Sequence, residues 1–100
     1  MAKKNANEVN NINDLAMWIS EGQQVGFTFG ERNYCIAYGA YADGQGYISL
    51  SELGIEPPVG CYIDLDEFLT YARVQGNFLA QIWPLVTEIK LFIPKETAQM

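Results

Sequence analysis

Histidine is absent from this 100-residue chain, and cysteine is scarce. Without an imidazole, the chain has no Ser-His-Asp or Cys-His hydrolytic machinery, no histidine acid–base catalyst and no His-ligated zinc. Two cysteines, Cys35 and Cys61, are too few for a four-cysteine metal site and for a disulfide-built secreted domain. We therefore predict two reduced, mostly buried thiols that pack as small apolar side chains, with a single disulfide between them as the alternative. We also predict that the chain is not an enzyme and uses neither a metal nor a cofactor.

Long apolar runs are also missing. No stretch approaches the roughly 18 consecutive apolar residues of a transmembrane helix. The start of the chain is polar and lacks the apolar centre of a signal peptide. These two features predict a cytoplasmic protein with no contact to a membrane.

Apolar side chains are nevertheless sufficient for a core, because 49% of the residues are apolar and 13% are aromatic. At this length one domain is expected. We predict a flexible polar tail over residues 1–10, a single domain over residues 11–93 and a C-terminal tail over residues 94–100.

The first half of the chain predicts one helix and three strands. Asn13 is a suitable N-cap, and Leu15, Trp18 and Ile19 fall on one helical face that ends near Gly22. Apolar residues then alternate over 25–29, 34–38 and 47–51, with turn residues at 30–33 and 43–46. This pattern predicts a three-stranded antiparallel meander.

The second half predicts two helices. Residues 53–60 form a loop, and 61–63 extend along the sheet edge. Asp64 and Glu67 stand in capping-box positions before the apolar face formed by Leu65, Phe68, Leu69 and Ala72. Residues 74–77 break this helix, and apolar residues with helical spacing follow over 78–89. At Pro84 this last helix either kinks or gives way to a fresh helix that starts at Trp83-Pro84. Residues 89–93 have a strand as the alternative. The order α-β-β-β-α-α predicts an α+β domain with helices on one face of the sheet.

Charge is unevenly distributed along the chain. Residues 5–89 hold 11 acids against the two bases Arg32 and Arg73, which leaves a net charge of −9. Such a body repels phosphate and so disfavours direct binding of nucleic acid or an anionic membrane, whereas it attracts basic proteins. Solubility alone is the alternative explanation for the acidity.

Other motifs have structural explanations. The acidic group Asp64, Asp66 and Glu67 coincides with a helix start, where carboxylates complement the helix dipole, so we interpret it as capping rather than as a metal site. The glycines near residue 44 lack any phosphate-loop pattern and are interpreted as turn residues.

Tyrosines gather around the second predicted turn. Tyr38, Tyr41 and Tyr47 surround it, and alternation cannot bury all of them. Exposed tyrosine favours protein interfaces, and base stacking would need more basic neighbours than this segment has. A half-buried core position is the alternative for each of these tyrosines.

Two segments resemble known inhibitors. In its opening Asn11-Ile12-Asn13-Asp14-Leu15, its element order and its acidity, the chain resembles phage-encoded type II-A anti-CRISPR proteins. Ile36-Ala37-Tyr38, Gly44 and Tyr47-Ile48-Ser49-Leu50 are similar to the acidic antirestriction family of DNA mimics. Both resemblances imply a small acidic protein of phage, plasmid or bacterial origin that occupies the basic nucleic-acid cleft of a defence nuclease. The chain lacks the dense acidic run of these families, so no functional residue is transferred from them.

The leading hypothesis is therefore a non-enzymatic, protein-binding inhibitor that acts by electrostatic mimicry. A toxin-immunity protein or antitoxin is one alternative, and a structural or self-associating domain is another; monomer and homodimer both stay open. The predicted cleft-facing acids are Glu31, Asp43, Glu52 and Glu56, and the predicted anchors are Tyr38, Tyr41 and Tyr47.

Overall fold

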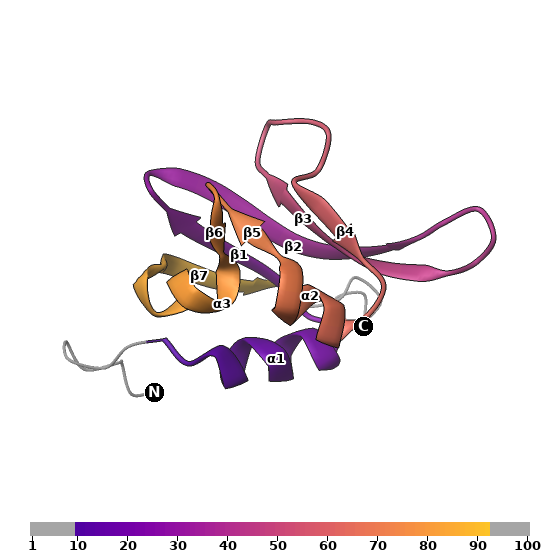
Figure 1. The fold of residues 1–100 in the computed structure, drawn as a ribbon, viewed down its shortest axis with the longest axis horizontal. Coiled ribbons are helices and arrows are strands. Elements are labelled where there is room, and N and C mark those ends of the chain that lie inside the picture. The colour runs from indigo at the N-terminus through magenta and orange to yellow at the C-terminus, as the bar shows by residue number, and fades with distance from the viewer. Residues whose placement is uncertain (1–9, 93–100) are drawn as a thin grey trace.

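A computed structural model describes residues 10–92 as an α+β domain. Its centre is an antiparallel five-stranded sheet with the strand order β4-β3-β2-β1-β7, and helices pack against one face (Figure 1). The sheet contains β1 (Gln24–Phe29), β2 (Arg32–Ala40), β3 (Gly46–Glu52), β4 (Gly60–Tyr62) and β7 (Thr87–Phe92). The remaining elements are α1 (Ile12–Ser20), α2 (Leu65–Tyr71), the two-stranded sheet of β5 (Arg73–Val74) and β6 (Asn77–Phe78), α3 (Leu79–Ile82) and the 3-10 helix η1 (Trp83–Leu85).

Helix α1 forms where the sequence predicted it, but it begins two residues earlier. Asn11, not Asn13, is the N-cap, and its Oδ1 accepts a hydrogen bond from the Asn13 amide at 2.8 Å. Either asparagine is able to cap, and the earlier start makes Ile12 part of the helix, where it packs against the core. The predicted end at Gly22 is confirmed, with φ at +78° and the paired backbone bonds of a Schellman motif.

The predicted meander of β1, β2 and β3 is confirmed, with one shorter turn. Gly30 and Glu31, with φ of 60° and 66°, form a two-residue turn between β1 and β2. The turn does not extend to residue 33, because Arg32 pairs with Phe29 and Asn33 pairs with Thr28. Strand β4 pairs with β3, which confirms the extension along the sheet edge.

The predicted last helix over residues 78–89 is wrong. Only α3, of four residues, and η1 are helical, and the chain then enters β7. Pro84 has no amide hydrogen to continue an α-helix, and β7 instead pairs with β1, adding an edge strand to the sheet. The alternative strand is thus confirmed over residues 89–92, whereas residue 93 lies outside the described part.

The core lies between the helices and the sheet face that carries Val25, Ile36 and Leu50. Trp83 is fully buried there, and its ring meets that of Phe27 edge-on at a centroid distance of 5.4 Å. The opposite sheet face, which we call the open face, has mostly small side chains in its central rows. These are Gly26, Cys35 and Ser51 in one row, and Ala37, Ser49 and Cys61 in the next.

Both cysteines are free thiols, as predicted, but the predicted burial is wrong, because Cys35 is half-buried and Cys61 is exposed on the open face. Cys35 lies on β2 and Cys61 on β4, with β3 between them. Two strand spacings amount to about 9.6 Å, which exceeds the Cα separation of about 6.8 Å that a disulfide tolerates. Burial raises the pKa of the Cys35 thiol, so the uncharged form is favoured.

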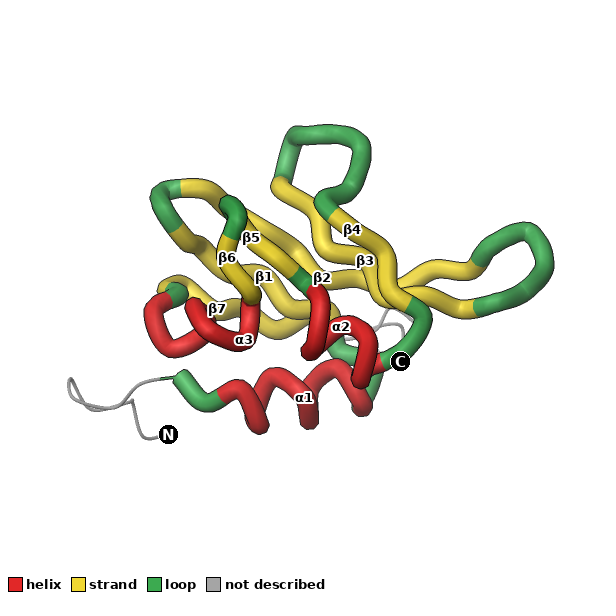
Figure 2. The backbone as a smooth tube through the Cα atoms, viewed as in Figure 1, coloured by secondary structure: helices red, strands yellow, loops and turns green. Residues whose placement is uncertain are grey.

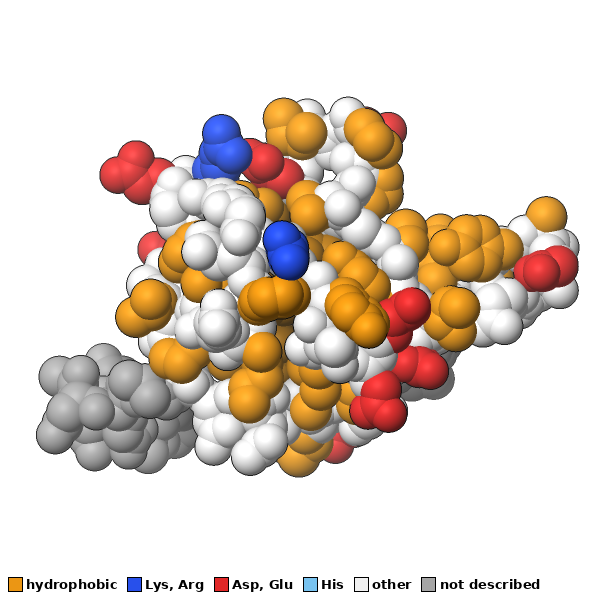
Figure 3. Space-filling view, in the orientation of Figure 1, with side chains coloured by type: hydrophobic (Ala, Val, Ile, Leu, Met, Phe, Trp, Pro, Cys, Tyr) orange, Lys and Arg blue, Asp and Glu red, His pale blue; other side chains and the backbone are white. Residues whose placement is uncertain are grey.

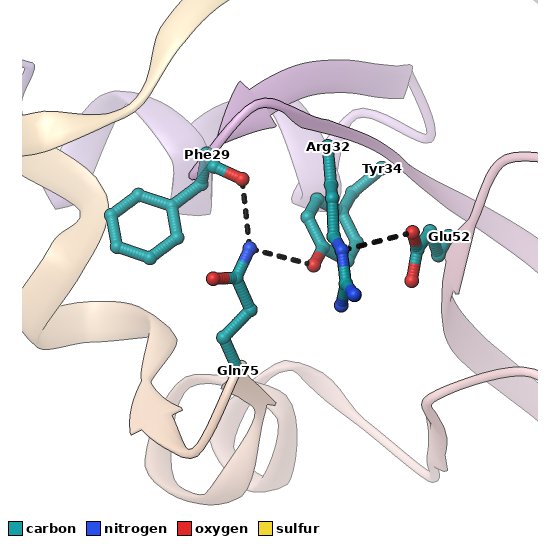
Figure 4. A network of polar contacts seen from close by, with 5 residues as sticks. All are labelled: Phe29, Arg32, Tyr34, Glu52 and Gln75. Carbon is teal, nitrogen blue, oxygen red and sulfur yellow. Dashed lines mark hydrogen bonds and ion pairs between the residues drawn. The ribbon is translucent and has the colours of Figure 1, made fainter.

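A glutamine ties the small β5–β6 hairpin to the main sheet (Figure 4). Gln75 Nε2 donates to the Phe29 carbonyl at 2.8 Å and to the Tyr34 hydroxyl at 3.0 Å. Beside this contact, Arg32 Nε and Glu52 Oε2 form an ion pair at 3.6 Å. Gly30 suits this position because its φ is +60°, and a Cβ atom there would lie 2.6 Å from Gln75 Oε1 and would displace the Gln75 side chain.

Two expectations concern the ends of the chain. The predicted tails fall largely on residues 1–9 and 93–100, which lie outside the described residues. Asn10 is described, and its side-chain amide donates to the carbonyls of Trp83 and Val86 at 3.2 and 2.8 Å. None of the described helices has the length and hydropathy needed to cross a bilayer.

Candidate protein-interaction site

The hairpin of β2 and β3 continues past the helices as a projecting arm (Figure 2). We define the arm as residues 39–47, none of which is buried. Its tip is ordered by its own hydrogen bonds: the Tyr41 amide donates to the Gln45 carbonyl at 2.9 Å, and the Gly44 amide donates to the Tyr41 carbonyl at 2.8 Å. Asp43 Oδ1 accepts from the Gln45 amide at 2.9 Å. The arm is therefore a preformed projection and not part of the core.

Two of the predicted anchors meet on this arm. The rings of Tyr41 and Tyr47 have a centroid separation of 4.7 Å and a tilt of 44°. Tyr47 lies opposite Gly39, and its ring covers that glycine so closely that a Cβ atom there would lie 2.6 Å from Tyr47 Cζ. Tyr41 is 48% exposed. The pair presents an aromatic surface whose conformation is already restricted, which lowers the entropy cost of binding.

Tyr38 does not belong to this surface. It alternates with Gly39 along β2, so its side chain lies on the helix-covered face, where it is half-buried. Its hydroxyl donates to the Gln23 carbonyl, in the connection between α1 and β1. Burial, and to a smaller extent the charge of the Cys35 thiolate, raises the pKa of Tyr38 to about 12. Tyr38 therefore connects β2 to the chain after α1 and supports the base of the arm.

The predicted acids separate into two groups. Asp43 lies at the tip of the arm, whereas Glu31, Glu52 and Glu56 lie at the opposite end of the sheet. The eight steps of β2 between these ends span about 26 Å. Glu52 is additionally paired with Arg32. The four carboxylates therefore do not form one continuous surface.

A second acidic group stands at the base of the arm. Strand β4 runs antiparallel to β3 and returns the chain toward the arm, so α2 begins there, and acidic side chains gather beside the arm (Figure 3). The predicted capping role is confirmed: Asp64 Oδ1 accepts from the Glu67 amide at 2.9 Å, and Glu67 Oε1 accepts from the Ile63 amide at 2.6 Å. Asp66 is exposed and makes no hydrogen bond or ion pair with the described residues.

Basic groups lie elsewhere in the described part of the chain. Residues 10–92 contain ten acids and three bases. Arg32 is paired with Glu52, Arg73 lies 4.3 Å above the centroid of the Phe78 ring, and Lys90 is on β7. The arm and the start of α2 hold Asp43, Asp64, Asp66 and Glu67 without a base of their own, so this end of the molecule carries a negative field.

Within residues 10–92, no three His, Cys, Asp or Glu side chains are grouped so as to hold a metal ion. The arm instead combines aromatic area, one exposed carboxylate at its tip and unpaired negative charge at its base. This combination is typical of a surface that contacts another protein.

Comparisons with known proteins add no assignment to this geometry. No protein-family model, no curated protein and no solved structure matches the chain.

Sequence reasoning missed two aspects of this site. It did not predict that the arm projects beyond the core, although the small residues Gly39, Ala40, Ala42, Gly44 and Gly46 are a visible signal that large buried side chains stop there. It also treated Asp66 only as a helix-dipole residue, because the proximity of α2 to the arm depends on the direction of β4.

Proposed function

We propose that this protein is a non-enzymatic inhibitor that binds a basic protein through its arm end. The binding surface comprises Tyr41, Asp43 and Tyr47 of the arm together with Asp66 at its base. The observation that carries the proposal is the projecting, preformed aromatic arm beside a group of acids with no base in the same segments. Tyrosine rings supply contact area, and the negative field accelerates encounter with a basic surface.

The partner class follows from the charge. Clefts that bind nucleic acid are lined by lysine and arginine, and carboxylates presented on an arm compete with phosphates for those side chains. A defence nuclease has such a cleft. The chain's resemblance to anti-CRISPR and antirestriction proteins supports the same class. The inhibitor would therefore act by excluding nucleic acid rather than by modifying the nuclease.

The test is a pull-down from bacterial lysate at low salt and again at about 0.5 M salt, where the Debye length falls to about 4–5 Å. The first bait is the intact chain. The second has residues 41–45 replaced by Asn-Gly, which joins the paired residues Ala40 and Gly46 by a two-residue turn. We expect the intact bait to hold a basic nuclease at low salt and release it at high salt, and the shortened bait to hold none.

Two results would contradict the proposal. One is equal capture of the partner by both baits, which would exclude the arm as the binding surface. The other is that the intact bait holds no protein at either salt concentration. Capture of a basic toxin in place of a nuclease would contradict the nuclease-inhibitor function and indicate a toxin-immunity protein, because both kinds of protein attract their partner with the same negative charge.

A further inference from the structure

The open face of the sheet has a groove that the proposed inhibitor surface does not use. Its volume is about 270 Å³, and it lies over β1, β2 and β7. Gly26 forms its floor, because a Cβ atom there would lie 3.3 Å from Phe92 Cε2, so the Phe92 ring leans across the strand as one wall. Leu53, which is 60% exposed, adds a second apolar wall.

A bulge in β7 brings two opposite charges into this groove. Gly26 pairs with Lys90 and Thr28 pairs with Thr87, so Glu88 and Ile89 together stand opposite the single residue Phe27. Glu88 takes a φ of 55°, in the left-handed region. Bulges of this kind redirect side chains, and here both Glu88 and Lys90 line the groove.

These two charges have no partner within residues 10–92. The one ion pair of this part of the chain joins Arg32 to Glu52. Neither Glu88 nor Lys90 has a hydrogen bond or ion pair with any other described side chain. The Cα atoms of two residues at this spacing on a strand lie about 6–7 Å apart, and Glu88 and Lys90 form no ion pair with each other.

A polar side chain completes the groove. Thr28 Oγ1 donates to Asn33 Oδ1 at 2.7 Å, which uses the amide oxygen and leaves the two amide hydrogens of Asn33 as donors. Asn33 and Thr28 both line the groove. The groove thus offers an ammonium and amide hydrogens for an anionic group, a carboxylate for a cationic group, and two apolar walls.

We propose that this groove binds a small zwitterion with an apolar side chain, of the amino-acid class. The ligand carboxylate faces Lys90, its ammonium faces Glu88, and its side chain packs on Phe92 and Leu53. A simple anion would be repelled by Glu88, and a simple cation would be repelled by Lys90. A ligand that carries both charges therefore complements the groove. The volume lies slightly below the roughly 300–1,000 Å³ of sites for drug-sized ligands, in keeping with a smaller molecule.

The test follows the amide NMR spectrum of the intact chain during titration with L-phenylalanine. Two analogues serve as matched probes: phenethylamine lacks the carboxylate, and hydrocinnamate lacks the ammonium. We expect the amide signals of Gly26, Cys35 and Lys90 to shift with a dissociation constant on the order of 1 mM for phenylalanine. Each analogue should bind about threefold to fivefold more weakly, because it lacks one exposed ion pair.

Substitutions assign each charge. Lys90→Gln should abolish the preference for phenylalanine over phenethylamine, and Glu88→Gln should abolish the preference over hydrocinnamate. Asp66→Asn, which removes a carboxylate outside the groove, should change neither preference. The proposal is overturned if no groove amide shifts up to about 10 mM phenylalanine, or if the three probes bind the wild-type chain equally well. The comparison of the three probes on the wild-type chain tests the zwitterion site even if a variant fails to fold.

Discussion

Tyr38 shows how a single side chain near the candidate site serves the fold. Its hydroxyl holds the chain after α1 against β2, and its ring is half-buried beneath the arm. We predict that Tyr38→Phe lowers the free energy of unfolding at neutral pH by about 1 kcal/mol, the usual net contribution of one hydrogen bond. Urea unfolding measures this change. Tyr71→Phe, at an exposed position, is the control and should change stability by less than about 0.5 kcal/mol.

The raised pKa of Tyr38 has a consequence in alkaline solution. Because the folded-state pKa of about 12 lies above the ordinary value of 10, the folded protein holds this proton more tightly than the unfolded chain. The resulting stability is fully present below about pH 10 and is lost as the pH rises toward 12. We predict that Tyr38→Phe makes the decline in unfolding free energy between pH 10 and 12 shallower, whereas an unchanged slope would refute the assignment. Burial also raises the pKa values of Cys35 and Tyr62, so part of the decline should persist.

Residue-scale predictions succeeded where one local interaction decided the outcome. Asp64 and Glu67 occupy capping positions that the sequence alone specifies. Asp64 caps the Glu67 amide as expected, whereas Glu67 accepts from the amide of Ile63, one residue before the N-cap. Asn11 and Asn13 are chemically equivalent as N-caps. The packing of Ile12 on the core is what favours Asn11, because it requires Ile12 to be part of the helix. That packing is a tertiary contact, which no local pattern contains.

At the scale of elements, the contact of Gln75 ties the β5–β6 hairpin to the main sheet. Tyr34 is 3% exposed, so removal of the Gln75 amide leaves its hydroxyl with one hydrogen-bond partner fewer in a buried setting. We predict that Gln75→Ala lowers the free energy of unfolding by about 1–3 kcal/mol. Gln81→Ala, on an exposed position of α3, is the matched control and should change it by less than about 0.5 kcal/mol. Equal effects in chemical denaturation would contradict this role.

The arm should be separable from the fold. Since no residue between 39 and 47 is buried, replacement of residues 41–45 by Asn-Gly removes no core side chain. We predict a change in the free energy of unfolding of less than about 1 kcal/mol, with a cooperative transition preserved. Loss of cooperativity in thermal or urea unfolding would show instead that the arm is part of the core structure.

Strand β7 is the element that sequence reasoning misassigned, for a definable reason. Ile82, Trp83, Val86 and Ile89 have helical spacing, and a short apolar run is compatible with either a helix or a strand. The strand is decided by its pairing with β1, which lies about 60 residues earlier in the chain. The strands β1, β2 and β3 were predictable because apolar and polar residues alternate along each of them. Each also pairs with its neighbour in the chain through a short turn that the local sequence specifies.

At the scale of the whole molecule, topology divides the predicted site. A meander places successive turns at opposite ends of a sheet, so the predicted meander already implied that Asp43 would lie far from Glu31 and Glu56. The place of Asp66 beside the arm could not be inferred in this way, because it depends on the pairing of β4 with β3. The sequence therefore supplied the arm's aromatic and acidic residues, while the fold selected the acids that accompany them.

The measurement that tests the central claim most directly compares two charge reversals at opposite ends of the molecule. Asp43→Lys with Asp66→Lys changes the arm end, and Glu31→Lys with Glu56→Lys changes the far end by the same net charge. Association rates with the captured basic partner are measured at low salt. We predict a fall of about tenfold or more for the arm-end pair and less than about threefold for the far-end pair. Equal falls, or a larger fall for the far-end pair, would contradict binding through the arm.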